Sequence, residues 1–324
     1  MGIGSVARWS AVAIAVVAAV VGIITYESTP DPGDLAGFGF ADAWVRGEVA
    51  RVEPSTCPAT DDPCTDVTFE VTEGADAGTF VQQTFPGGPS SPAFEVGDPV
   101  YLSYSEDAEA AYAYGYADRA RLGVILGWGA VFAAAVVLLG RWKGFAALVG
   151  VGMSLAVILG YVLPTLLGGG SPITVALVGA TVIAAATIWL THGVTAFSGV
   201  ALLGTFGALA LTAVLSELAF EMAKITGLAT EEAVYLTLLP DVDVSGLVLA
   251  GAVLGALGAL DDVTITQTSA VWEVRAANPD LDRRALSAAG LRVGRDHIAS
   301  TVNTLVLAYA GASMPLLVLF LLSN

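Results

Sequence analysis

Apolar residues fill seven long runs of the chain, and polar residues gather between these runs. The runs cover residues 9–24, 122–139, 145–167, 172–190, 198–220, 247–268 and 301–322. A helix of about 20 apolar residues is long enough to cross the hydrocarbon core of a bilayer. The pattern therefore predicts a polytopic α-helical membrane protein with about seven transmembrane helices.

The segment from residue 27 to residue 121 has a different pattern. Short stretches rich in Val, Phe, Tyr and Thr alternate there with Gly, Pro and Asp, which is typical of strands separated by turns. These stretches cover residues 43–52, 66–71, 79–84 and 99–104. We expect a small β-barrel, similar to the oligonucleotide/oligosaccharide-binding (OB) fold, inserted after the first helix.

Three domains follow from this order. Residues 1–26 are a transmembrane anchor, 27–121 the β domain, and 122–324 a six-helix transmembrane domain with a cytoplasmic helix near 273–297. The first run begins after Arg8, ends at Tyr26 and lacks a clear small-residue cleavage site. We therefore interpret it as a retained anchor rather than a cleaved signal peptide.

Basic residues in the short loops predict the orientation. Arg8, the turn with Arg141 and Lys143, and the arginines between residues 275 and 295 all fall on one side of a seven-span layout. Because Lys and Arg are retained on the cytoplasmic side, the amino terminus should be cytoplasmic and residues 27–121 should lie outside.

The β domain carries most of the negative charge. It holds 18 Asp and Glu residues against four Arg residues, a net charge of −14 out of −17 for the whole chain. Such a surface repels nucleic acid, which we exclude as a partner. We also find no GxxxxGK[ST], GxSxG or HExxH motif, so we expect no enzyme activity, no catalytic residues, no bound metal and no cofactor.

The only two cysteines, Cys57 and Cys64, lie in the loop between the first two predicted strands. Outside the cytoplasm, such a pair favours a disulfide. Asp61, Asp62 and Asp66 nearby offer oxygen ligands for Ca²⁺. A solvated acidic loop is the simpler interpretation of these three residues.

Asp261 and Asp262 stand side by side in the sixth apolar run, where burial of each carboxylate costs roughly 2.5 to 3.5 kcal/mol. Thr266 and Ser269 follow Asp262 at helical spacing, so a polar stripe runs toward the cytoplasm. We expect this stripe to line a hydrated path for protons or cations. In an alternative register the span covers residues 242–263, and both aspartates reach cytoplasmic water.

The last span opens with a matching polar set. Its members, which we predict to take part in proton or ion coupling with the aspartate pair, are Arg295, Asp296, Ser300, Asn303 and Thr304. A protonated carboxyl is tolerated in the apolar slab, whereas an ionised one needs Arg295, a cation or water. We interpret His192 and His297 as interfacial caps of their spans.

Four segments carry a family resemblance: Leu228-Ala-Thr-Glu-Glu-Ala233, Gly255-Ala-Leu-Gly-Ala-Leu-Asp-Asp262, the turn Asn278-Pro279-Asp280-Leu281, and the run from Gly294 to Tyr309. They resemble the YibE/F-like family of bacterial integral membrane proteins. The resemblance implies a location in the bacterial cytoplasmic membrane. The family pattern has one aspartate, at the position of Asp262, so Asp261 is a departure, and the family brings no assigned activity.

A second, fainter likeness is to the resistance–nodulation–division pumps and the SecD/SecF export factors. In those proteins an aspartate in the span before a cytoplasmic helix takes part in proton coupling. The likeness implies Asp262 as proton carrier, with Arg295, Ser300, Asn303 and Thr304 around it. The chain departs from this pattern in its odd number of spans.

Two functions remain open from the sequence. The first is a transporter, or another membrane device coupled to protons or cations, that uses the aspartates of the sixth span. The second is a non-transporting envelope scaffold that presents the β domain to other proteins. The expected partners are the lipid bilayer, a proton or cation, and a second copy or a paralogue of the chain.

Overall fold

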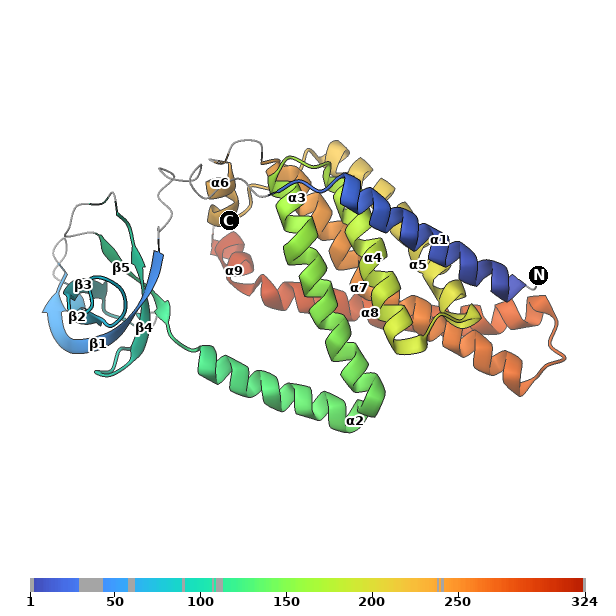
Figure 1. The fold of residues 1–324 in the computed structure, drawn as a ribbon, viewed down its shortest axis with the longest axis horizontal. Coiled ribbons are helices and arrows are strands. Elements are labelled where there is room, and N and C mark those ends of the chain that lie inside the picture. Colours follow the sequence, from blue (N-terminus) through green and yellow to red (C-terminus); the bar gives the residue numbers. More distant parts are fainter. Residues whose placement is uncertain are drawn as a thin grey trace. The chain divides into compact units, whose positions relative to one another are not determined.

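The computed structural model describes residues 3–28, 43–57, 62–88, 91–106, 108, 113–237, 239 and 242–322. The chain forms two compact units (Figure 1). The helical unit comprises Met1–Thr29 and Gly140–Asn324, and the β unit comprises Pro30–Leu139. We describe each unit by itself.

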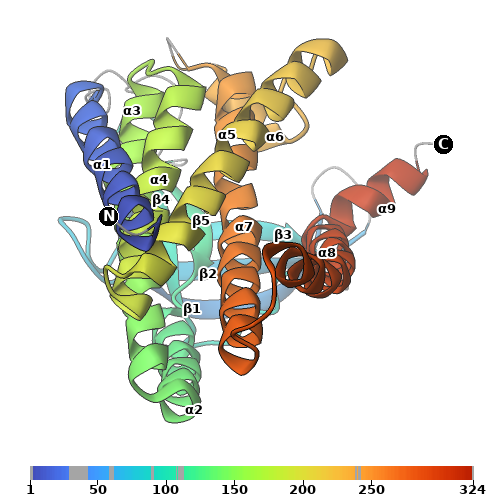
Figure 2. The same ribbon diagram turned by 90° about the vertical axis from the view of Figure 1, so that its right-hand side faces the viewer.

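The centre of the helical unit is built from four helices: α1 (Ile3–Ile24), α4 (Pro172–His192), α5 (Ala196–Ala223) and α7 (Val244–Ala277). Helices α4, α5 and α7 pack on one another, and α1 packs on α4 and α5 (Figure 2). Alanines such as Ala11, Ala180 and Ala250 are fully buried between them. Small side chains let apolar helices approach closely, which is how helices associate in a bilayer.

Glycines bring the helices closest together. A Cβ at Gly199 of α5 would lie 2.6 Å from the Cα of Arg8 in α1. A Cβ at Gly179 of α4 would lie 2.7 Å from the Val162 Cγ2. A Cβ at either position would therefore force the neighbouring group to shift.

The second and third predicted spans form one long run. It consists of α2 (Leu122–Val157), a π-helical turn η2 (Ile158–Val162) and α3 (Leu163–Leu167). Arg141 has a non-helical backbone (φ 53°, ψ −129°), so α2 is two helices joined at a kink where the sequence predicts a turn. The π-turn precedes Pro164, which has no N–H to donate and whose ring crowds the preceding turn.

The end of the chain differs from the prediction. A short helix α6 (Glu231–Leu236) precedes α7, which is followed by α8 (Arg283–Ala312) and α9 (Met314–Leu322). We expected a separate cytoplasmic helix and a new span from residue 301, but α8 runs through both. Asp282 caps the start of α8, where its carboxylate accepts from the Ala285 N–H at 2.7 Å. A bend of 71° separates α8 from α9.

The described residues contain five helices long and apolar enough to cross a membrane, or six if α8 and α9 form one broken span. This result confirms several long apolar helices, as a membrane protein requires. The number seven stays a prediction because residues 122–167 count as a single stretch. The orientation of the chain stays a prediction as well.

The β unit contains a five-stranded antiparallel sheet curled into a half-barrel, which confirms a small β domain after the first helix. The strands are β1 (Ala43–Thr56), β2 (Pro63–Val71), β3 (Phe80–Pro86), β4 (Pro99–Tyr104) and β5 (Tyr114–Arg119), in the order β3-β2-β1-β4-β5. Strand β5 was not predicted; its six residues include two tyrosines but also Gly115, Ala117 and Asp118, which are uncommon in strands. The Tyr116 N–H donates to the Gln83 Oε1 at 2.8 Å and links β5 to β3. The aromatic core centres on Phe69, whose ring contacts Phe85 and Phe94.

Cys57 and Cys64 form a disulfide with a Cα–Cα distance of 5.1 Å, as predicted. The carboxylate of Asp66 accepts hydrogen bonds from Thr84 at 2.6 Å, Ser55 at 2.9 Å and Gln82 at 3.3 Å. The Thr84 bond is the largest of the effects that lower the pKa of Asp66. Asp61 lies outside the described residues, and within the described part of the chain no group of three or more His, Cys, Asp or Glu could hold a metal.

Candidate functional site

Asp261 and Asp262 lie at the middle of α7. The helix has 34 residues, of which the aspartates are the eighteenth and nineteenth. At 1.5 Å per residue α7 is about 51 Å long, longer than the roughly 30 Å core of a bilayer. The pair is therefore more than four helical turns from either end of the helix.

The two aspartates have different surroundings. The face of α7 that packs on α4 and α5 includes Ala250, Val253 and Leu257, and it continues at helical spacing to Asp261. The Oδ1 of Asp261 is shielded from solvent, and the Asp261 carboxylate lies beside the Thr187 hydroxyl of α4. Asp262 is turned about 100° away, and its side chain is 72% exposed.

The likeness to the resistance–nodulation–division pumps implied Asp262 as the proton carrier. In the structure Asp261 is the half-buried carboxylate of the pair and Asp262 is the exposed one. The physical reason is the rotation of α7, which is set by the packing of its apolar face and not by the aspartates themselves.

Asp261 borders a cavity of about 350 Å³ between the second part of α2, α4 and α7. Its polar lining includes Ser154 from α2 and Thr187, Thr191 and His192 from α4. The Ser154 hydroxyl donates to the Gly150 carbonyl at 2.9 Å, and the Thr187 hydroxyl donates to the Ile183 carbonyl at 2.9 Å. Their protons are thus engaged within their own helices, so these oxygens face the cavity as acceptors.

The polar groups of the cavity are therefore mainly acceptors, and the His192 imidazole adds an N–H donor. Two carboxyl groups and several hydroxyl oxygens can all accept hydrogen bonds or coordinate a cation, and they lie among apolar residues such as Val151 and Ile265. Oxygen acceptors of this kind suit a proton carried on a carboxyl, a water molecule or a hard cation. They do not suit an anion.

Helix α8 contributes a histidine to the site. The His297 Nε2 lies 3.5 Å from the Asp262 Oδ2, and the imidazole is 28% exposed. This contact becomes an ion pair when His297 is protonated. The sequence analysis treated His297 as an interfacial cap, although Thr301 and Thr304 follow it at helical spacing and indicated the same face of the helix.

The other predicted coupling residues are not brought into the cavity. Ser300, Asn303 and Thr304 of α8 are exposed, and the Thr304 hydroxyl donates to the Ser300 carbonyl at 3.0 Å. Four more predicted residues, Thr266, Ser269, Arg295 and Asp296, are also exposed. Of the predicted set, only the two aspartates line the cavity.

A hydroxyl pair fixes α7 beside the site. The Oγ1 of Thr264 lies 2.7 Å from the Oγ1 of Thr205, a buried residue of α5. Thr264 is one turn after Asp261 on α7 and also approaches the Asp261 carbonyl at 3.2 Å. The pair therefore holds the rotation of α7 that encloses Asp261.

A second acidic cavity lies near the start of α7. It has a volume of about 400 Å³ and is lined by Glu217 and Glu221 of α5 and by Asp243, the residue before α7. The Oδ1 of Asp243 accepts from the Gly246 N–H at 2.9 Å and caps the helix. Asp243 and Asp261 are 18 residues apart, or about 27 Å along the helix axis.

The fold and this site define a class: a protein of several long apolar helices with a carboxylate pair at a hydroxyl-lined cavity. Residues 128–324 match the family described as YibE/F-like protein, and the chain belongs to this family. The matched region contains the whole cavity, while α1 and the sheet lie outside it. Comparison with the curated proteins and with the solved structures gave no match.

Proposed function

We propose that the protein moves protons or other small cations as part of a transport cycle, and that Asp261 is the carboxyl that binds the ion. The observation that carries this proposal is the solvent-shielded Oδ1 of Asp261, whose carboxylate lies beside the Thr187 hydroxyl and borders a cavity lined mainly by acceptor oxygens. An ionised carboxylate is costly in apolar surroundings, and a bound proton or cation removes that cost.

Asp262 and His297 transmit the binding event to α8. The 3.5 Å contact between them is strong when both groups are charged and weak when either is neutral. Loading of the aspartate pair would therefore change the contact between α7 and α8. Such a difference lets an ion bias an equilibrium between two packings of the helices.

The orientation predicted from the basic residues completes the proposal. In it, the amino terminus is cytoplasmic, the β unit lies outside the bacterial cytoplasmic membrane, and the β unit is a partly open barrel of the OB type. The net charge of −14 on residues 27–121 would concentrate cations at the outer surface. A second copy or a paralogue would shield the exposed polar side chains of α8 from lipid.

The test is ion flux into proteoliposomes. With a potential imposed across the vesicle membrane, we expect Asp261→Asn to abolish flux, because the amide cannot bind and release a proton. Asp262→Asn should slow it. Glu273→Gln, which removes an exposed carboxylate three turns further along α7, should transport as the wild type does. Wild-type flux in Asp261→Asn would overturn the proposal.

The scaffold function is supported by a different observation. The β unit is a separate compact unit, and it exposes large apolar side chains, including Trp44 and Phe80. Exposed aromatic residues are common at protein interfaces. Loss of a binding partner in Trp44→Ser, together with normal flux in both aspartate variants, would favour the scaffold.

A further inference from the structure

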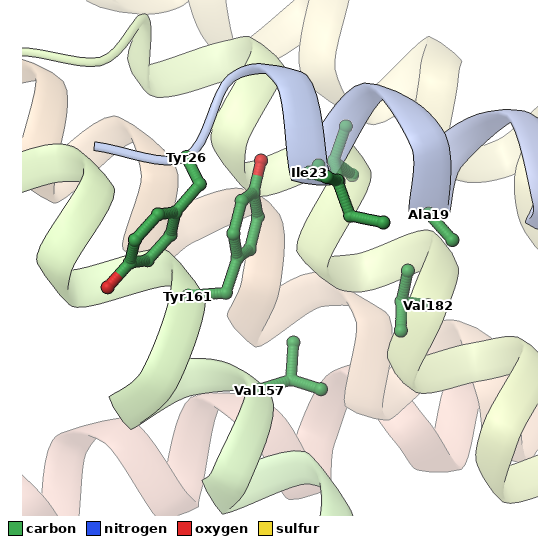
Figure 3. A pocket seen from close by; sticks show the side chains of 8 residues that line it. Ala19, Ile23, Tyr26, Val157, Tyr161 and Val182 are labelled. Atoms are coloured by element: carbon green, nitrogen blue, oxygen red, sulfur yellow. The ribbon is translucent and has the colours of Figure 1, made fainter. Parts of the chain in front are cut away.

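An apolar groove of about 420 Å³ lies in the helical unit and shares no lining residue with the aspartate cavity (Figure 3). Helix α1 lines it with Ala19 and Ile23. The other walls are Val157 at the end of α2, Tyr161 in the π-turn and Val182 in α4. The groove therefore lies between three segments that are each apolar enough to cross a membrane.

The walls of the groove are positioned by specific features. A Cβ at Gly22 would lie 3.0 Å from the Val178 Cγ1 and 3.6 Å from the Tyr161 ring, so a glycine keeps this end narrow but open. The Thr25 hydroxyl donates to the Val21 carbonyl at 2.8 Å and lies 3.1 Å from the Tyr161 hydroxyl. Because the Thr25 proton is engaged, Tyr161 is the donor of the second bond, which fixes its ring as a wall.

The polar groups of the groove lie at one end only. Thr25, Tyr26 and Tyr161 bring hydroxyls to the carboxyl-terminal end of α1, whereas the rest of the lining is aliphatic. Tyrosines gather where the hydrocarbon of a bilayer meets its head groups. The groove is therefore apolar along most of its length and has hydroxyl groups at one end. This distribution matches the polarity of an amphiphile.

We infer that this groove binds one acyl chain of a membrane phospholipid, with the ester end of the lipid at Tyr26, beside the Thr25–Tyr161 hydroxyl pair. A water molecule in this groove would find no hydrogen-bond partner on its aliphatic walls. An empty groove would leave the wall atoms without dispersion contacts. A hydrocarbon chain from the surrounding bilayer supplies those contacts. This lipid site is independent of Asp261 and of the proposed ion flux.

The experiment uses the full chain in nanodiscs of phosphatidylethanolamine and phosphatidylglycerol. A phosphatidylglycerol with a diazirine midway along one acyl chain is added and irradiated, and mass spectrometry locates the adducts. We expect adducts on Val157, Val178 and Val182. Ala19→Phe, which fills the groove from an exposed position, should lower their yield roughly tenfold because the phenyl ring replaces the chain.

Val17→Phe is the matched control, because Val17 lies on the same helix, is 61% exposed and does not line the groove. It should leave the adduct yield unchanged. Uniform labelling of all outward faces of the helical unit would overturn the inference, as would an equal effect of both variants. Labelling by a diazirine fatty acid but not by the phospholipid would also overturn it. Asp261→Asn should keep the adducts, so this result is separable from that of the flux experiment.

Discussion

At the scale of single residues, one position along a helix decides which aspartate is enclosed. Asp261 continues the buried face that runs through Val253 and Leu257, and Asp262 does not. Both carboxylates have the same chemistry and nearly the same position along the axis of α7. Their different surroundings arise only from the 100° step between neighbouring residues of a helix.

Asp66 in the β unit gives a prediction for pH dependence. Its hydrogen bonds to Thr84, Ser55 and Gln82 lower its pKa in the folded state below the ordinary value of 3.8. The stabilisation is therefore present above that value and is lost as the pH falls through the lower, folded-state pKa. We expect the β unit to unfold at lower temperature below about pH 4.

The measurement is hydrogen exchange of β2 peptides during heating of the full chain at a series of pH values, with variants compared at the same pH. Asp66→Asn should unfold more easily at neutral pH and lose part of the acid dependence. Asp62→Asn, at an exposed acid in the preceding loop, is the control. An unchanged pH profile in Asp66→Asn would contradict the assignment.

At the scale of elements, the contact of α1 with α5 depends on Gly199. A Cβ there meets the backbone of Arg8, which can move only if α1 moves. We expect Gly199→Ala to destabilise the helical unit by about 1–3 kcal/mol, the usual cost of overpacking. Thermal unfolding in detergent measures this change.

Gly207 provides the comparison within the same helix. A Cβ at Gly207 meets nothing within 4 Å, so Gly207→Ala adds no clash. Alanine favours a helix over glycine by roughly 0.5–1 kcal/mol, so this variant should be equal to the wild type or more stable. Equal destabilisation by both variants would show that packing on Arg8 is not the cause.

The Cys57–Cys64 disulfide closes the loop between β1 and β2, with a sequence separation of seven residues. By restricting this short loop in the unfolded chain, the disulfide stabilises the folded β unit by about 2.5 kcal/mol. We expect the double variant Cys57→Ser/Cys64→Ser to lower the unfolding temperature of the β unit without a change in the helical unit. Separate proteolysis of the two units on heating would detect this, and a uniform shift would argue against it.

At the scale of the whole molecule, the orientation in the membrane is the property that every functional argument uses. Ser171 lies before α4 and Asn278 lies after α7, and both are exposed. The predicted topology places Ser171 outside the cell and Asn278 in the cytoplasm. The native cysteines are engaged in the disulfide, so each position can be tested with one introduced cysteine.

We expect a membrane-impermeant maleimide to label Ser171→Cys in intact cells and Asn278→Cys only after permeabilisation. The physical reason for the cytoplasmic location of Asn278 is that the basic residues near it are retained on the cytoplasmic side of the membrane. Labelling of both positions from the same side would show that the number of spans between them is even. Labelling with the sides exchanged would place the β unit in the cytoplasm.

The linear order of apolar and polar residues determined the long helices, the β domain after the first helix, the disulfide and the family, because each depends on local composition or on residues close in sequence. It also identified the aspartate pair, since carboxylates stand out in an apolar run. Tertiary packing decided that Asp261 is enclosed, that His297 and not Asn303 approaches Asp262, and that Ser154 and Thr187 complete the cavity. The reason is that helix rotation and neighbour choice depend on how small residues on several helices fit together, a property that no single segment carries.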